Sequence, residues 1–407
     1  MAGYNDIEQN EYERERERRR ARAAAKAARR RKKMIIWYSK VAAFLILILG
    51  FFIASIVFAV KDIKLGLTLR DIESTPQPVY GGVGIEAHPA IDTSFRTQFE
   101  EEEAAAKEAA KAVHVFESDE NTASIGSDVV SEHAILIDLN TDKILANRDG
   151  KSKIYPASMT KIMTVLVAAE RLESIEKLDD TFCVTPEINY FSYKNDCSAV
   201  GFADNEVVTV RDLFYGTILP SGADAAVSLA TYIAGDQDAF VELMNQKCEE
   251  LGISGTTHFT NCVGLYDDEN YSTCYDIAVI LHAAIRNELC REVLSAHRYT
   301  TSPTPEHPEG IDISNWFLRR IEDKDCGGVV ECAKTGFVVQ SRNCSASFAD
   351  DDQGNNFICV TTNSTNHWRC IYDHVAIYQK YFPGYQGGDD VPPPKDTDAS
   401  DTSESEN

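Results

Sequence analysis

Hydrophobic and polar residues change their spacing several times along this chain, and the first folded elements are predicted near residue 134. Two short apolar runs, at residues 134–138 (AILID) and 143–146 (KILA), are separated by polar turn residues, which predicts a β-hairpin. Between residues 159 and 172 the apolar positions recur at the three- and four-residue spacing of an amphipathic helix. Further helices with this spacing are predicted at residues 210–219, 225–234, 238–251 and 276–286.

The strand pattern returns after residue 328. Three apolar runs joined by polar turns predict strands at residues 329–337, 343–349 and 356–362, and residues 368–382 predict a closing helix. Strands at both ends of this region therefore enclose helices in its middle. We expect an α+β fold in which an antiparallel sheet is flanked by helices and carries an inserted helical lobe. A cleft between two such lobes is a common place for a functional site.

A separate apolar run lies upstream, at residues 41–60, and contains no charged residue. A helix needs about 20 apolar residues to cross a bilayer, whereas the apolar part of a signal peptide has about 7–15. We therefore expect residues 34–60 to be an uncleaved transmembrane anchor. A buried core helix is the alternative, but the strongly basic segment at residues 14–33 disfavours it. The positive-inside rule places residues 1–33 in the cytoplasm and the remainder outside the membrane.

The chain has 40 basic and 64 acidic residues, for a formal net charge of −24. Nucleic-acid binding needs a basic surface, so an acidic body after residue 33 excludes nucleic acid as the expected partner. Because the basic arm adjoins the apolar run, it is predicted to contact anionic lipid.

Composition also divides the part of the chain beyond the anchor. Residues 61–125 contain a Pro- and Gly-rich stretch followed by an Ala- and Glu-rich helix former, which is typical of a stalk or linker. Residues 126–385 are predicted to form the folded domain. Residues 386–407 are acidic and rich in Ser and Pro, so we expect a disordered tail.

All eleven cysteines lie between Cys183 and Cys370, on the side predicted to be outside the cell membrane. Such a compartment permits disulfides, and an odd number leaves at least one cysteine unpaired or bonded to another chain. Cys332, Cys344 and Cys359 fall on the three predicted neighbouring strands, where one bridge is geometrically allowed. The alternative is that several cysteines are small buried apolar residues. No zinc-type spacing is present, and no metal or cofactor is expected.

Candidate chemistry begins at Ser158 and Lys161, three positions apart at the start of the predicted helix. Residues at this spacing share one helix face, so the two side chains are expected to meet. A serine hydroxyl is a weak nucleophile that needs a neighbouring base, and a lysine is a base only when neutral. Burial and a nearby cation both lower a lysine pKa, and Lys334 is the candidate for that cation.

Two further motifs follow, at residues 221–223 (SGA) and 334–336 (KTG). The second lies on a predicted strand, which can hydrogen-bond an extended peptide along its edge. The backbone amides of Ser158 and Phe337 are candidates for an oxyanion hole. Gly336 has no side chain to block a close approach of the substrate backbone.

In this order the three motifs form the set found in β-lactamases and penicillin-binding proteins. With the segments YPASMTKIMT, LPSGADAA, FTNCVGLYDDENYSTCYD and CAKTGF, residues 134–362 resemble the low-molecular-weight penicillin-binding proteins, the serine-type D-alanyl-D-alanine carboxypeptidases. The resemblance implies a β-lactamase/transpeptidase-like domain. It also implies that peptidoglycan stem peptides ending in D-Ala-D-Ala are the substrate, and that β-lactams are inhibitors.

The resemblance implies a role for each motif residue. Ser158 is acylated with release of the terminal D-alanine, and the acyl-enzyme is then hydrolysed. Lys161 is the general base, and Ser221 relays a proton to the leaving amine. Lys334 and Thr335 hold the terminal carboxylate of the substrate.

Two positions depart from the family pattern. Ala223 stands where the middle motif usually has an asparagine that would contact the acyl amide of the substrate, so a change in affinity or specificity is expected without loss of chemistry. Asn270 stands where similar sequences often carry a histidine.

Three alternatives remain beside the carboxypeptidase. A β-lactamase is disfavoured by the SGA motif at residues 221–223 and by the predicted anchor. A transpeptidase or endopeptidase stays open, because the motifs do not encode whether water or an amine accepts the acyl group. A non-catalytic binder of cell-wall peptides is the minority hypothesis, supported only by Ala223.

Overall fold

The computed structural model describes residues 115–351, 353–383 and 385. The predicted cytoplasmic arm, the transmembrane anchor, the stalk up to residue 114 and the acidic tail lie outside these residues. Among the helices of the described ranges, none is long and apolar enough to cross a membrane.

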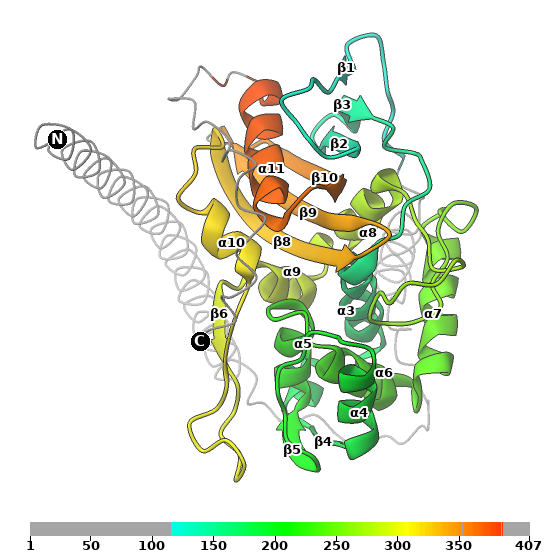
Figure 1. Cartoon of the computed structure of the whole chain (residues 1–407), viewed down its shortest axis with the longest axis vertical. Helices are drawn as coiled ribbons and strands as arrows, with labels where there is room; N and C mark the ends of the chain where they lie inside the picture. The colour runs from blue at the N-terminus through cyan, green and yellow to red at the C-terminus, as the bar shows by residue number, and fades with distance from the viewer. Residues whose placement is uncertain (1–114, 352, 384, 386–407) are drawn as a thin grey trace, which may run out of the picture. The chain divides into compact units, whose positions relative to one another are not determined.

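The main sheet has six strands in the order β1-β3-β2-β10-β9-β8 (Figure 1). Its strands are β1 Ala123–Ser124, β2 His133–Asp138, β3 Lys143–Arg148, β8 Gly328–Val338, β9 Arg342–Asp351 and β10 Asn356–Ser364. The predicted hairpin is confirmed as the antiparallel pair β2–β3, and the three predicted late strands are confirmed as β8, β9 and β10. The expected all-antiparallel sheet is wrong in one respect, because β1 pairs with β3 in parallel and makes the sheet mixed.

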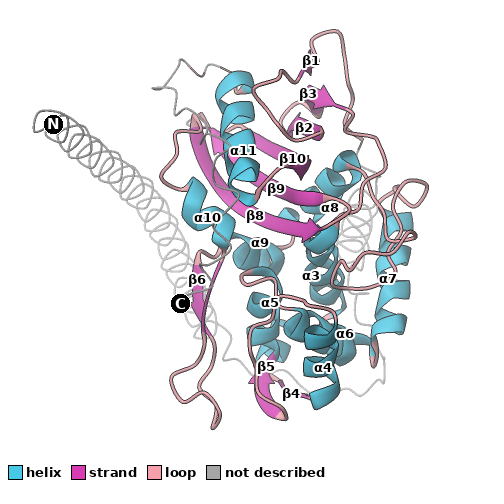
Figure 2. Cartoon of the chain, viewed as in Figure 1, coloured by secondary structure: helices cyan, strands magenta, loops and turns pink. Residues whose placement is uncertain are grey.

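Strands from the two ends of the folded region meet in the middle of the sheet. β2 pairs with β10 in antiparallel register, with Leu136 opposite Cys359. The segment between β3 and β8 therefore leaves the main sheet and returns to it, and it contains the predicted inserted lobe. Figure 2 shows that this segment is mainly helical.

Each predicted helix is present with its ends moved by a few residues. The helices are η1 Ala157–Met159, α3 Thr160–Arg171, η2 Ile175–Asp179, α4 Pro186–Lys194, α5 Val210–Ile218, α6 Ala223–Ala234, α7 Gln237–Glu250, α8 Cys274–Arg286, α9 Glu288–Ser295, α10 Trp316–Ile321 and α11 His367–Tyr381. Two small antiparallel pairs join β4 Thr181–Val184 to β5 Glu206–Thr209 and β6 Arg298–Thr300 to β7 Asp312–Ser314. Several short elements were not predicted, namely η2, α4, α9, α10, β1 and the two small pairs. Most of these elements have too few residues for the hydrophobic spacing of a helix or strand to be recognised in the sequence.

Apolar side chains leave the sheet on both faces and enter two cores. Along β2, Ile135 and Ile137 belong to the larger core, whereas Ala134 and Leu136 belong to the smaller one. This alternation is the two-residue period of a strand. α10 and α11 cover the face of the smaller core, and α3, α8 and α9 pack in the larger core, which continues into the lobe (Figure 1).

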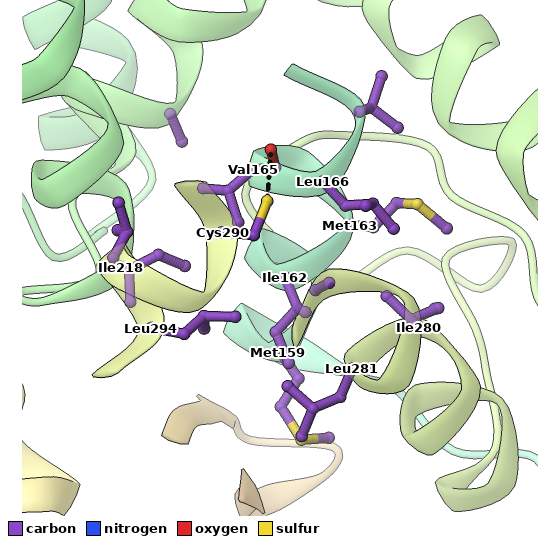
Figure 3. Packing of buried hydrophobic residues seen from close by; sticks show 14 of the residues in the cluster. Met159, Ile162, Met163, Val165, Leu166, Ile218, Ile280, Leu281, Cys290 and Leu294 are labelled. Atoms are coloured by element: carbon purple, nitrogen blue, oxygen red, sulfur yellow. Dashed lines mark hydrogen bonds between the residues drawn. The ribbon is translucent and has the colours of Figure 1, made fainter. Parts of the chain in front are cut away.

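Helix α3 lies at the centre of the larger core. Figure 3 shows Ile162, Val165 and Leu166 of α3 surrounded by apolar side chains from neighbouring helices. The thiol of Cys290 on α9 also reaches the Val165 carbonyl oxygen, at 3.4 Å. A fully buried aliphatic side chain contributes about 1.5–3 kcal/mol, so this packing fixes α3 firmly. The same packing therefore also fixes the position of the short helix η1, which directly precedes α3.

The packed part of the chain begins upstream of the expected domain boundary at residue 126. Phe116 is buried, contacts Tyr275 and His282 edge to face, and donates its amide to the Tyr275 hydroxyl at 2.9 Å. Ile125 is buried in the smaller core. The segment from residue 116 to residue 125 therefore packs within the folded domain, although the sequence analysis assigned it to the linker by its composition.

All eleven cysteines are free thiols, so the bridge that the strand positions allowed among Cys332, Cys344 and Cys359 is not formed, and the alternative of buried apolar cysteines holds for most of them. Cys344 lies opposite Gly336, and Cys332 lies opposite Phe348, so the two thiols are displaced along the β8–β9 pair. Cys359 points into the smaller core, whereas Cys332 and Cys344 point into the larger one. Strand membership brought these residues near one another, but register and facing keep their sulfurs apart.

Candidate active site

Ser158 lies on the short helix η1, directly before α3, as the sequence predicted. It is half-buried, and the residue before it, Ala157, has a φ of 48°. A non-glycine residue in this left-handed region is strained, and such strain clusters at functional sites. The tight turn places the Ser158 side chain directly before α3, and the rest of α3 is buried in the larger core.

Lys161 occupies the first turn of α3 and is 2% exposed. Its Nζ donates to Ser158 Oγ at 3.1 Å and to the Val263 carbonyl oxygen at 2.8 Å. Burial lowers the pKa of Lys161 to about 8, although Cys197, Cys262 and Asp224 oppose this effect. A lysine with this pKa is partly neutral near physiological pH, which is the form that accepts a proton.

Ser221 lies between α5 and α6 and has a φ of 63°. Its Oγ accepts a hydrogen bond from Lys334 Nζ at 2.8 Å. Three residues later, at the start of α6, the Asp224 carboxylate accepts hydrogen bonds from the amides of Val200 and Gly201 at 2.9 Å and 3.0 Å, which connects this segment to residues 200–201. The second motif is therefore a hydrogen-bonded turn whose Ser221 hydroxyl contacts Lys334 of the third motif.

Lys334 lies on β8, is also 2% exposed, and donates to the Thr335 carbonyl oxygen at 2.9 Å. Burial and the positive charge of Lys161 hold the pKa of Lys334 well below its usual value. From the sequence, Lys334 was the candidate cation that lowers the pKa of Lys161. In the structure burial is the main cause of the lowered pKa of both lysines, and the charge repulsion between them adds to it at Lys334.

The third motif also contacts the Ser158 turn through its glycine. A β-carbon on Gly336 would lie 2.9 Å from Ser158 N and 3.0 Å from the Ala157 Cβ. β8 is the last strand of the sheet order, so its backbone passes the Ser158 turn at the sheet edge. Only a glycine allows this approach without displacing one of the two segments.

The structure thus brings four predicted side chains into one group of two Ser–Lys pairs: Ser158 with Lys161 and Ser221 with Lys334. The other predicted residues of β8 take part differently. Thr335 contributes its carbonyl oxygen to Lys334, and the Phe337 side chain is 60% exposed.

The loop between α7 and α8 supplies contacts that the sequence analysis did not assign. Val263 offers the carbonyl oxygen that accepts from Lys161, and Gly264, with a φ of 85°, lies against Ala157. Asn270, the unusual residue of this segment, is buried and donates to the Leu265 carbonyl oxygen at 3.0 Å. Gly264 was the one residue of this loop whose type suggested a close contact. A backbone carbonyl such as that of Val263 has no signature in the sequence.

Two Ser–Lys pairs beside the edge strand of an α+β fold define a penicillin-binding and transpeptidase-like protein. The chain belongs to the D-alanyl-D-alanine carboxypeptidase family, whose sequence profile matches residues 119–366.

Individual relatives agree with this assignment. The chain is 29% identical to the D-alanyl-D-alanine carboxypeptidase DacF of Bacillus subtilis over 54% of each chain. It is 37% identical to DacA of Escherichia coli over 39% of this chain and 40% of DacA. The matched region therefore spans about half, or less, of the length of these relatives.

Solved structures of the class share the fold. A mutant of the Streptomyces K15 DD-transpeptidase superposes with a TM-score of 0.55 and 25% identity, covering 61% of this chain and 97% of that one. Penicillin binding protein 5 from Haemophilus influenzae has a TM-score of 0.55 and 26% identity, covering 63% and 71%.

Proposed function

We propose that this protein is a serine-type D-alanyl-D-alanine carboxypeptidase that trims peptidoglycan stem peptides through a Ser158 acyl-enzyme. The observation that carries the proposal is the 3.1 Å hydrogen bond between Lys161 Nζ and Ser158 Oγ, in a site beside an edge strand. The names of the relatives support the choice of substrate.

Acylation begins when neutral Lys161 takes the proton of the Ser158 hydroxyl. Ser158 Oγ then attacks the carbonyl carbon of the penultimate D-alanine and forms a tetrahedral intermediate. The backbone amides of Ser158 and Phe337 stabilise the negative oxygen of this intermediate. The close approach of Gly336 to the Ser158 nitrogen supports this arrangement of donors.

Collapse of the intermediate breaks the peptide bond and releases the terminal D-alanine. The leaving amine needs a proton, and Ser221 relays one to it. Lys334 supports this role because its Nζ donates to Ser221 Oγ at 2.8 Å and supplies a chain of exchangeable protons. Water then attacks the acyl-enzyme with Lys161 as base, which frees the trimmed peptide and regenerates Ser158.

The terminal carboxylate of the substrate binds at Lys334 and Thr335. Burial, and then the repulsion between the ammonium groups of Lys161 and Lys334, lower the pKa of Lys334. A carboxylate that enters between Ser221 and β8 relieves this repulsion and favours the charged form of Lys334. Recognition of a free C-terminus therefore follows from the charges already in the site. β-Lactams carry a carboxylate and a reactive amide, and they acylate the same serine.

Outside the described residues, we assign residues 1–33 to the cytoplasm, residues 34–60 to a membrane anchor and residues 386–407 to a tail. The anchor holds the catalytic domain, which includes residues 126–385, on the outer side of the cell membrane. The charge-free run at residues 41–60 and the basic residues before it support this arrangement.

A DD-transpeptidase is the second candidate, favoured by the structural likeness to the Streptomyces enzyme. The two activities differ only in whether water or an amine takes the acyl group from Ser158. A competition between these two acceptors therefore separates them.

The test uses the full-length chain in detergent and a fluorescent penicillin. The wild-type protein is expected to become covalently labelled, and Ser158→Ala is expected to stay unlabelled. Ser228→Ala is the matched control, because Ser228 is a buried serine on α6 outside the group of Ser–Lys pairs. Failure of the wild type to label would contradict the proposal and favour a non-catalytic binder.

Release of D-alanine is then measured on a peptide ending in D-Ala-D-Ala, with and without an added amino-acid acceptor. Release of one D-alanine per trimmed peptide, with little transfer to the acceptor, supports the carboxypeptidase. Predominant transfer to the amine would replace it by the transpeptidase.

A further inference from the structure

The general base of the proposed mechanism is held by a loop far from it in sequence. Besides Ser158, Lys161 Nζ contacts the Val263 carbonyl oxygen at 2.8 Å. This oxygen belongs to the segment between α7 and α8, outside the three motifs. The position of that one oxygen therefore affects how the amine of Lys161 is oriented.

One side chain holds the turn that carries the oxygen. Asn261 Oδ1 accepts hydrogen bonds from the amides of Val263, Gly264 and Leu265 at 3.3, 2.7 and 2.9 Å. Its Nδ2 donates to the Leu265 carbonyl oxygen at 3.1 Å. Asn261 is 8% exposed, so water cannot readily replace these bonds.

The same turn also supports the nucleophile. A β-carbon on Gly264 would lie only 1.8 Å from the Ala157 carbonyl oxygen, so the turn lies directly against the residue before Ser158. A displacement of the turn therefore moves both the acceptor of Lys161 and the support of Ser158. Both contacts depend on the three amides that Asn261 binds.

We infer that Asn261 is a positioning residue for acylation: it fixes the Val263 carbonyl oxygen, which in turn orients the amine of Lys161 toward Ser158. This inference rests on the proposed function. A neutral lysine amine has two hydrogens and one lone pair. When one hydrogen points to a fixed carbonyl, the lone pair is free to face the Ser158 hydroxyl.

The unusual second motif increases the importance of this acceptor. Ala223 is completely buried and offers only a methyl group, so the side chain at this position cannot hydrogen-bond Lys161. The orientation of the amine then depends on Ser158 and Val263.

Burial is the largest influence on the pKa of Lys161, and a change at residue 261 removes none of the titratable groups around this lysine. They are Asp224 on α6, Cys197 in the segment after α4, Cys262 in the same loop as Val263, and Lys334 on β8. A shift of the titration in an Asn261 variant therefore reports on the Val263 acceptor.

The experiment measures the acylation rate of the full-length protein by a fluorescent penicillin between about pH 6 and pH 10, across the titration of the base. Asn261→Ala is expected to lower the maximal rate about ten- to a hundred-fold, since a misplacement of about 1 Å can cost about a hundred-fold. The acid limb of the profile is expected to move to lower pH, because a loose carbonyl stabilises the charged lysine less.

Two further variants separate orientation from simple loss of stability. Asn261→Asp keeps an oxygen that accepts from the three amides and is expected to recover most of the maximal rate. Asn245→Ala is the matched control, because Asn245 braces the same loop at Phe259, accepting from its amide at 2.9 Å and donating to its carbonyl oxygen at 2.8 Å. It is expected to keep the wild-type rate and acid limb.

The inference is overturned if Asn261→Ala shows the wild-type rate and pH profile, or if Asn245→Ala reproduces its loss. It is also overturned if Asn261→Ala lowers the rate equally at every pH, which is the effect of a smaller folded fraction. An unlabelled wild type would instead reject the proposed function itself, and this inference with it.

Discussion

The backbone nitrogen of Ser158 lies 2.9 Å from the position that a β-carbon on Gly336 would occupy. The nucleophile turn and the edge strand β8 therefore meet backbone to backbone. In the proposed mechanism, this contact aligns the strand that binds the peptide with the serine that attacks it. A side chain at residue 336 would separate the two.

Gly336→Ala is expected to lower the rate of penicillin acylation by about a hundred-fold, because the new methyl group pushes β8 away from the oxyanion site. The change is also expected to cost about 1–3 kcal/mol of stability through overpacking. Stopped-flow labelling and urea unfolding measure the two effects. Gly255→Ala is the control, since a β-carbon there meets no described atom within 4 Å. Wild-type acylation by Gly336→Ala would contradict the assigned contact.

The acylation rate is expected to rise with pH and to level off above about pH 8. The pKa of Lys161 is lowered to about 8, and only the neutral amine accepts the proton of Ser158. Below this pH the rate is expected to fall about tenfold per pH unit, because the neutral fraction falls by that factor. Measuring the rate of penicillin acylation over a series of pH values tests this rise.

Lys161→Arg is the corresponding control, because a guanidinium group stays charged at every accessible pH. It is expected to acylate very slowly throughout, without a rising limb. A wild-type profile that stays flat from acid to alkaline pH would show that Lys161 is not the base.

His374 is expected to make the protein less stable as the pH falls below about 6.5. This histidine is fully buried between α11 and the sheet, and its nitrogens contact the hydroxyls of Ser345 and Ser347 at 2.9 Å and 2.7 Å. Burial lowers its pKa to about 3. Between the two values the unfolded chain binds a proton that the folded chain does not, so unfolding is favoured by up to about 1.4 kcal/mol per pH unit.

Urea unfolding of the wild type and of His374→Gln over a series of pH values tests this expectation. The variant is expected to be less stable near neutral pH but to show a shallower loss toward acid pH. Parallel pH dependences for the two proteins would mean that His374 takes up its proton in the folded state.

The eleven thiols are expected to react with a thiol reagent in three groups. Cys183 is exposed, Cys197 is half-buried and the other nine are buried. Burial also raises the pKa of thiols such as Cys248 and Cys274 to about 12, so little reactive thiolate forms. In the native protein Cys183 is therefore expected to react quickly, Cys197 slowly and the rest only after unfolding.

Counting thiols with a colorimetric reagent, with and without denaturant, tests this order. Cys183→Ser is expected to remove the fast phase alone. A total below eleven in denaturant would reveal a disulfide and contradict the free-thiol structure.

Features that depend on neighbouring residues were predictable from the sequence. The meeting of Ser158 and Lys161 follows from three-residue spacing on one helix, and the hairpin β2–β3 follows from two apolar runs around a polar turn. The motifs also implied the family, which the sequence profile confirms. The short element α10 escaped prediction, because its six residues are too few to show a period.

Contacts between distant segments were decided by the tertiary structure alone. Lys334 meets Ser221 across 113 residues of chain, and Lys161 meets the Val263 carbonyl across 102. A backbone carbonyl is present at every residue, so its identity as an acceptor cannot be read from the residue type. Only the path of the chain selects it.

The sequence by itself therefore determined the candidate reactive side chains, their local spacing and the order of the longer helices and strands. The tertiary structure decided the environment of those side chains. It buries Lys161 and Lys334 near one another, which lowers the pKa of both, and it keeps Cys344 and Cys359 on opposite faces of the sheet. The physical reason is that burial, charge repulsion and strand facing depend on positions in space, which residues far apart in the chain determine together.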